Sequence, residues 1–104
     1  RHFAAYAGPE SLRFGFDARV SEHDLRFTYL PVWEALVRRH AVGGVMSAIS
    51  GLNGAPGAAD KAMLTGVLRG EWGFKGHVIS DCDTIASIAR DYRYTSTIDE
   101  AAAA

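Results

Sequence analysis

The sequence lacks the features that mark several classes of protein. It has one cysteine, Cys82, among 104 residues, which excludes an internal disulfide and a multi-cysteine zinc site. Its apolar runs are short beside the roughly 20 residues of a membrane-spanning helix, so we expect no membrane partner. The chain opens at Arg1 with neither methionine nor a secretory leader pattern. We therefore expect it to be an excerpt of a longer protein.

The sequence also lacks an excess of charge of one sign. Lys and Arg number 11 against 12 Asp and Glu, and Arg38–Arg39 is the main basic cluster, so we expect no nucleic-acid partner. The glycine-rich stretch Gly51–Gly57 lacks the lysine of a phosphate-binding loop, and Pro56 removes an amide that would face phosphate. We read this stretch as a turn. We expect no cofactor and no metal.

What the sequence does have is an alternation of strand and helix patterns, within one domain of residues 1–104. Short apolar runs at His2–Tyr6, Val45–Ile49 and His77–Asp81 predict strands, and a turn-rich stretch from Ala7 to Val20 follows the first. Strands separated by helices pair in parallel through right-handed crossovers. The predicted class is α/β, with about three parallel βα units. Because a complete (β/α)₈ barrel takes roughly 250 residues, we expect a partial barrel segment.

Capping patterns predict where the helices begin. Ser21–Asp24 resembles a capping box before an apolar helical face, and Pro31 should divide that helix near Tyr29. Asp60 should cap a further helix that ends at Gly70. A second capping box at Thr97–Glu100 should open a last helix.

The most informative stretch is Gly76–Asp83, an apolar run that stops on Asp81. In βα architectures the C-terminal ends of the strands are where ligands and chemistry gather, so a carboxylate at this tip is a candidate catalytic group. The alternative is a helix N-cap, because Asp is a favoured capping residue and a helix could start near Thr84. Local pattern alone favours the N-cap.

Several longer segments carry motifs whose order and spacing decide between these readings. They are Arg1–Tyr6, Val20–Leu25, Tyr29–Pro31, Val45–Ala48, Asn53–Gly54, Leu64–Thr65, Val67–Gly76 and Val78–Asp81. The most specific is the run L-R-G-E-W-G-F-K-G, followed by a strand that ends in Ser-Asp. Together these segments cover essentially the whole chain. They resemble the N-terminal barrel domain of family 3 glycoside hydrolases.

The resemblance implies retaining hydrolysis of a terminal β-linked sugar, as in β-xylosidases and β-glucosidases, with Asp81 as the nucleophile. Retaining hydrolysis needs a second carboxyl group about 5 Å away. The resemblance puts this acid/base glutamate in a following domain, so the isolated segment should be inactive. The implied partners are a carbohydrate, the rest of the barrel and a C-terminal domain. The chain's own glutamates are unconvincing substitutes: Glu10, Glu22, Glu34, Glu71 and Glu100.

The resemblance also implies a set of substrate-binding residues, namely Arg1, His2, Met46, Ile49 and Cys82. Arg1 stands where the family usually has lysine, which keeps the charge but changes the contact geometry. Ile49 stands where many members have tyrosine, and Cys82 where many β-glucosidases have tryptophan. The Ser-Asp-Cys motif resembles the β-xylosidase and arabinofuranosidase branch. We therefore expect a preference for a β-linked pentose over glucose.

Three hypotheses follow. The chain is a segment of an active glycosidase with Asp81 as nucleophile; or it comes from a degenerate relative that binds sugar without cleaving it, as Arg1 and Ile49 suggest; or it is a structural α/β fragment in which Asp81 only caps a helix.

Overall fold

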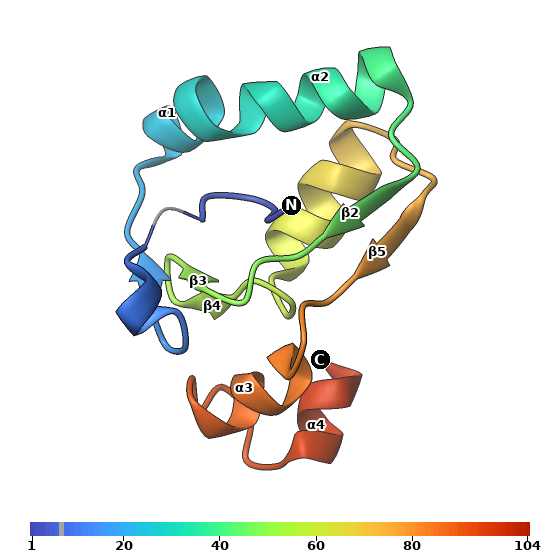
Figure 1. Ribbon diagram of the computed structural model, residues 1–104. Helices are drawn as coiled ribbons and strands as arrows, with labels where there is room; N and C mark the ends of the chain where they lie inside the picture. Colours follow the sequence, from blue (N-terminus) through green and yellow to red (C-terminus); the bar gives the residue numbers. More distant parts are fainter. Residues whose placement is uncertain (7) are drawn as a thin grey trace.

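The computed structural model describes residues 1–6 and 8–104 and shows an α/β arrangement (Figure 1). Its elements are η1 (Glu10–Leu12), β1 (Asp17–Ala18), α1 (Glu22–Asp24), η2 (Leu25–Tyr29), α2 (Leu30–His40), β2 (Gly44–Met46), β3 (Gly51–Leu52), β4 (Ala55–Pro56), η3 (Ala62–Glu71), β5 (His77–Ile79), α3 (Thr84–Arg90) and α4 (Ile98–Ala103). Ala7, where the predicted turn-rich stretch begins, lies outside the described residues.

Strands β2 and β5 form a parallel pair, in the register Gly44 to His77 and Met46 to Ile79. The predicted first strand is reduced to one parallel bridge between Phe3 and Ser47, in which the Phe3 N–H donates to the Met46 carbonyl over 2.8 Å. This segment pairs on one side only. Three complete parallel βα units are therefore not present among the described residues.

A second sheet consists of three short strands. Strand β1 pairs in parallel with β3, and β3 pairs antiparallel with β4. The predicted turn at Gly51–Gly57 is thus a hairpin, and its two turn residues, Asn53 and Gly54, have φ values of 50° and 93°. Asn-Gly favours such left-handed hairpin turns. The Asn53 side chain also accepts from the Val20 N–H over 2.9 Å and donates to the Val20 carbonyl over 2.8 Å, which fixes the chain after β1.

Elements α1, η2 and α2 form one continuous helix across the top of Figure 1. The Ser21 hydroxyl accepts the Asp24 N–H over 3.0 Å, which confirms the predicted start. The predicted break at Pro31 is wrong. The helix continues because η2 is a π-helical turn, in which the Leu30 N–H donates to the Leu25 carbonyl, and Pro31 then falls in the first turn of α2, where its missing N–H costs little.

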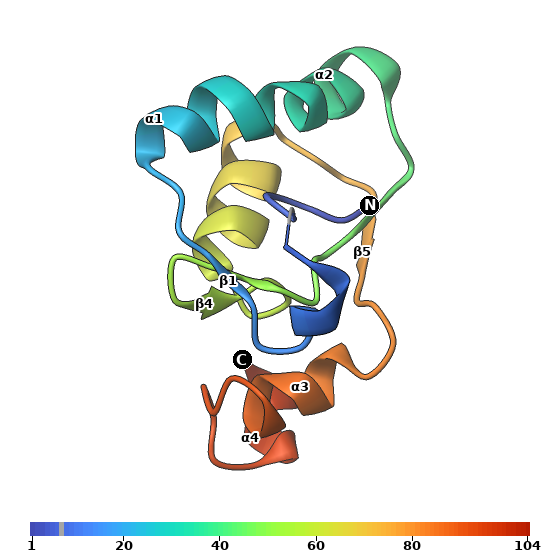
Figure 2. The same cartoon turned by 60° about the vertical axis from the view of Figure 1, so that its left-hand side comes forward.

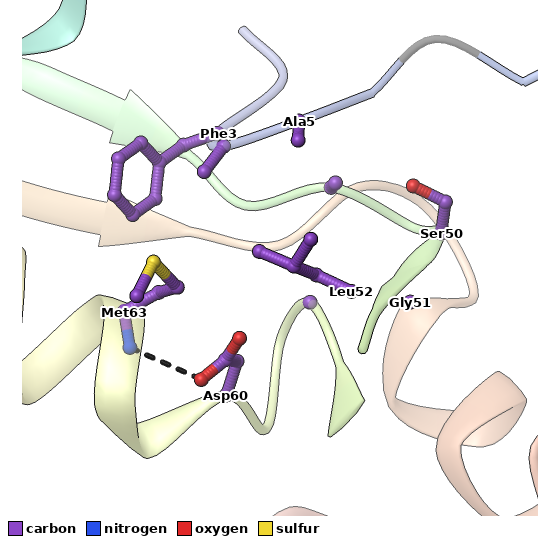
Figure 3. Close-up of a pocket in the computed structure, with 10 residues that line it drawn as sticks. Phe3, Ala5, Ser50, Gly51, Leu52, Asp60 and Met63 are labelled. Atoms are coloured by element: carbon purple, nitrogen blue, oxygen red, sulfur yellow. Dashed lines mark hydrogen bonds between the residues drawn. The ribbon is translucent and has the colours of Figure 1, made fainter. Parts of the chain in front are cut away.

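Helix η3 begins where the sequence predicts and ends later. The Asp60 carboxylate accepts the Met63 N–H over 3.0 Å, which confirms the predicted cap (Figure 3). The predicted end at Gly70 is wrong, because the helix runs to Glu71. The Trp72 N–H closes its last turn on the Val67 carbonyl over 3.0 Å, and Gly73, with φ of 69°, supplies the left-handed residue that follows.

The core lies between the β2–β5 pair and the helices above it. Phe3 is 1% exposed, and its ring meets the rings of Trp33 and Trp72 edge-on, at centroid distances of 5.3 and 6.0 Å. Trp72 and Phe74 are buried as well. Edge-on packing of this kind fixes the position of Phe3 and therefore of His2, the residue before it.

Helices α3 and α4 pack together below the strands (Figure 2). Their contact centres on Ile88 and Ala101, which form a small cluster with Ala59. The capping box that opens α4, with Thr97 and Glu100 bonded reciprocally, confirms that prediction. Along the described part of the chain, no helix has both the length and the apolar character of a membrane span.

Candidate active site

Asp81 follows strand β5 by two residues and precedes the first residue of α3, Thr84, by three. Its carboxylate accepts the Cys82 N–H over 2.7 Å, and its backbone carbonyl accepts the Thr84 N–H over 3.3 Å. The N-cap position of α3 belongs to Asp83, which has φ of 58° and makes no side-chain capping bond. The reading of Asp81 as a helix cap is therefore wrong, and its carboxylate is available for other partners.

The nearest of these partners is Arg13, which sequence reasoning did not single out. Its Nη2 donates to Asp81 Oδ2 over 2.6 Å, and its Nη1 lies 3.4 Å from Glu10 Oε1. Arg13 comes directly after η1, in the loop that precedes β1. A guanidinium held between two carboxylates is fixed in direction by both, and the Asp81 side chain is only 14% exposed.

His2 reaches the same carboxylate from the first segment of the chain. Its Nε2 lies 3.4 Å from Asp81 Oδ2, and its ring packs at a tilt on Tyr6, with centroids 5.0 Å apart. Partial burial lowers the pKa of His2 below 6.5, although the Asp81 charge acts in the opposite direction. At neutral pH we expect a neutral imidazole here, which can donate or accept a hydrogen bond.

The surroundings of Asp81 favour its charged form. The Cys82 N–H is the largest cause that lowers the pKa of the Asp81 carboxyl below 3.8; burial opposes it, and the Arg13 guanidinium lowers the pKa further. The carboxylate is therefore ionised over the whole neutral range, the state that attack on an electrophilic carbon requires.

The other residues implied by the resemblance lie at different distances from this cluster. Cys82 is exposed and adjoins Asp81 in the chain, and Arg1 is exposed beside His2. Met46 lies in β2 and is partly buried, whereas Ile49 is 2% exposed. The structure thus brings His2 and Cys82 to Asp81, and packs the Ile49 side chain into the interior.

A small void that is lined by neither Asp81 nor Arg13 nor His2 is too small for a ligand. It has a volume of about 10 Å³ and lies between Phe3, Ser50, Leu52 and Asp60 (Figure 3). This is the space of about one water molecule. Over residues 1–6 and 8–104, no three His, Cys, Asp or Glu side chains gather to hold a metal ion. The described residues therefore supply one largely buried, ionised carboxylate flanked by hydrogen-bonding groups.

Comparison with known proteins identifies the family to which this chain belongs. Residues 1–104 match the sequence profile of the glycosyl hydrolase family 3 N terminal domain. The chain belongs to glycoside hydrolase family 3. The resemblance inferred from the sequence motifs is confirmed.

Related family 3 proteins include a β-xylosidase/α-L-arabinofuranosidase of Medicago sativa subsp. varia, 42% identical over 88% of this chain and 12% of its own length. A probable exo-1,4-β-xylosidase of Aspergillus clavatus is 43% identical over 99% of this chain and 14% of its own length. This chain thus matches only 12% to 14% of the length of these relatives.

Solved family 3 structures share the fold. An exo-β-xylosidase in complex with a xylobiose aziridine activity-based probe superposes with a TM-score of 0.95, at 28% identity over 99% of this chain and 14% of its own. A β-glucosidase of Listeria innocua in complex with isofagomine gives 0.87, at 31% identity over 98% of this chain and 14% of its own. Both xylosidases and glucosidases are therefore similar to this chain.

Proposed function

We propose that the chain is part of a retaining β-glycosidase that removes terminal β-linked sugars, with Asp81 as the nucleophile. The observation that carries the proposal is the contact set of Asp81: an ionised carboxylate beyond the end of β5, bonded to Arg13 and the Cys82 N–H and close to His2. The family membership supplies the reaction class.

In the proposed mechanism, an Asp81 carboxylate oxygen attacks the anomeric carbon and forms a glycosyl ester while the bond to the leaving oxygen breaks. A general acid protonates that oxygen. The same group, now a base, removes a proton from water, which attacks the anomeric carbon and frees Asp81. We propose that the acid/base is a glutamate outside this chain, because Glu10, close to Asp81 through Arg13, is 78% exposed and paired with that arginine.

The neighbours of Asp81 have separate roles in this proposal. Neutral His2 and charged Arg1, from the first segment, would hydrogen-bond the hydroxyls of the sugar, and Cys82 would face its ring. Met46 and Ile49 would support the site from the strand side. The proposed context is a partial (β/α)₈ barrel, in which the parallel Phe3–β2–β5 arrangement supplies neighbouring strand ends and a C-terminal domain completes the site.

The test uses the full-length protein that carries this segment and the purified 104-residue chain. We expect the full-length protein to hydrolyse an aryl β-xyloside or β-glucoside. Asp81→Asn should lose at least about a thousandfold in kcat, as removal of a nucleophile does elsewhere. The exposed Asp99 gives a matched control, and Asp99→Asn should retain activity.

The isolated chain should show no turnover, because the general acid, worth about 10² to 10⁴ in rate, is absent from it. Sugar binding without turnover by the full-length protein would favour the degenerate relative. Neither binding nor turnover would favour a purely structural role.

A further inference from the structure

The loop that carries Arg13 is fixed at its far end by a side chain distant in the sequence. The Phe16 carbonyl, three residues after Arg13, accepts the Gly51 N–H over 2.7 Å and the Tyr92 hydroxyl over 2.8 Å. Between Arg13 and Phe16, Gly15 has φ of 91°, a backbone conformation that favours glycine. The direction of Arg13 therefore depends on where Phe16 is held.

Tyr92 is placed for this bond by helix α3. Its N–H donates to the Ser87 carbonyl over 3.1 Å, just past the end of the helix. Gly51 makes room for the ring, because a Cβ at that position would lie 3.0 Å from Tyr92 Cε1. Burial raises the pKa of the Tyr92 hydroxyl, so it stays protonated and keeps donating through the neutral range.

These contacts form a closed series that starts and ends at Asp81. Asp81 precedes α3, Tyr92 follows it, and Tyr92 holds the loop from which Arg13 returns to Asp81. We propose that Tyr92 is a positioning residue for the glycosidase reaction, which acts through Phe16 to hold Arg13 against the nucleophile. The inference rests on the proposed function and adds to it a residue that touches no substrate.

The expected signature is a shift in pH dependence. The groups that face the Asp81 carboxylate are Arg13, His2 and the Cys82 N–H, and Glu10 faces Arg13 from η1. If Arg13 is released, Asp81 loses a positive neighbour and its ionised form becomes less favourable. The acid limb of kcat/KM, which reports groups of the free enzyme, should then move to higher pH.

The experiment compares Tyr92→Phe with wild type in the full-length protein, using an aryl β-xyloside. Tyr92→Phe keeps the ring and removes the donor, so we expect kcat/KM to fall about three- to tenfold, as for one lost hydrogen bond, and the acid limb to rise. The control is Tyr94→Phe, because Tyr94 is 52% exposed, and it should change neither. A structural role alone would lower thermal stability without moving the acid limb.

A second measurement does not need activity. In a crystal structure of the Tyr92→Phe protein, we expect the Arg13 Nη2 to Asp81 Oδ2 distance to exceed hydrogen-bonding range. Wild-type turnover with an unchanged acid limb in Tyr92→Phe would overturn the role of Tyr92 and leave the glycosidase proposal standing. Absence of wild-type turnover would overturn the glycosidase proposal, and an unchanged Arg13–Asp81 contact in the crystal would overturn the positioning role.

Discussion

Arg13 Nη2 donates to Asp81 Oδ2 over 2.6 Å, across 68 residues of sequence. This contact joins the loop after the first segment to the end of β5. It holds the carboxylate on one side while the Cys82 N–H holds it on the other. The two donors fix the orientation of Asp81 and favour its charge, which are the two requirements of a carboxylate nucleophile.

Removal of the arginine should weaken both effects. In Arg13→Gln we expect kcat/KM to fall at least about tenfold, because charge-assisted bonds are the stronger class. The folded pKa of Asp81 is depressed, so its stabilising effect is present above 3.8 and is lost as pH falls through the folded value. Arg13→Gln raises that folded value, so activity should fall at higher pH than in wild type, and the stabilising contribution of Asp81 above 3.8 should be smaller. The pH profile of kcat/KM measures the change.

Arg19 offers the control for this variant. It pairs with Asp17 over 2.7 Å and its side chain is 78% exposed. Arg19→Gln removes the same charge from the other end of β1, away from Asp81, and it should leave the pH profile unchanged. Equal shifts in both variants would mean that net charge, and not the Arg13 contact, sets the titration of Asp81.

Two substitutions of Asp60 should have different effects on the stability of the protein. Asp60→Ala removes the η3 cap and should lower the free energy of unfolding by about 1 kcal/mol. Asp60→Asn keeps an oxygen for the Met63 N–H and removes a buried charge, so it should be at least as stable as wild type. Burial raises the pKa of Asp60. The contribution of Asp60 to wild-type stability therefore falls as the pH rises from 3.8 through the folded pKa. The stability advantage of Asp60→Asn should grow over the same pH range.

Thermal unfolding at several pH values checks this prediction. Ser21→Ala is the matched control, because it removes an exposed, uncharged cap and its cost should not depend on pH. A less stable Asp60→Asn at neutral pH would show that the carboxylate has a partner beyond the helix terminus.

Cys82 should influence which sugar is preferred. It is exposed beside Asp81, where a small side chain cannot stack on a sugar as an aromatic residue does. We expect the full-length protein to prefer an aryl β-xyloside to the matched glucoside. Cys82→Trp should lower the xyloside to glucoside ratio of kcat/KM by about tenfold, the scale on which pockets discriminate one added group. Cys82→Ser keeps the size and should keep the ratio, and a wild-type preference for glucoside would refute the assignment.

The position of Asp81 could be predicted because one short apolar run stops on it and because a specific motif precedes it. Arg13 could not be found in the same way. It lies in an irregular loop without periodicity, and its partner is 68 residues away, so only tertiary structure brings them together. The available signal was an arginine in the loop after the first strand pattern, at the same edge as Asp81.

Predictions of helices and strands from local sequence patterns were also wrong where tertiary contacts stabilise a different local structure. Pro31 does not divide its helix. It follows the π-helical turn η2 and lies in the first turn of α2, where a missing N–H costs little. Asn53–Gly54 carried a hairpin signal, but strands as short as β3 and β4 have too few residues to show alternation. The first strand pattern was also overestimated, because its residues have a pairing partner on one side only.

The nucleophile is the central claim, and covalent trapping tests it most directly. A 2-deoxy-2-fluoro β-xyloside slows release of the glycosyl ester, because fluorine destabilises the oxocarbenium-like transition state. After incubation with the full-length protein and digestion, peptide mass spectrometry should find the fluorosugar on Asp81. A label on Asp83, two residues away, or full activity in Asp81→Asn would contradict the account.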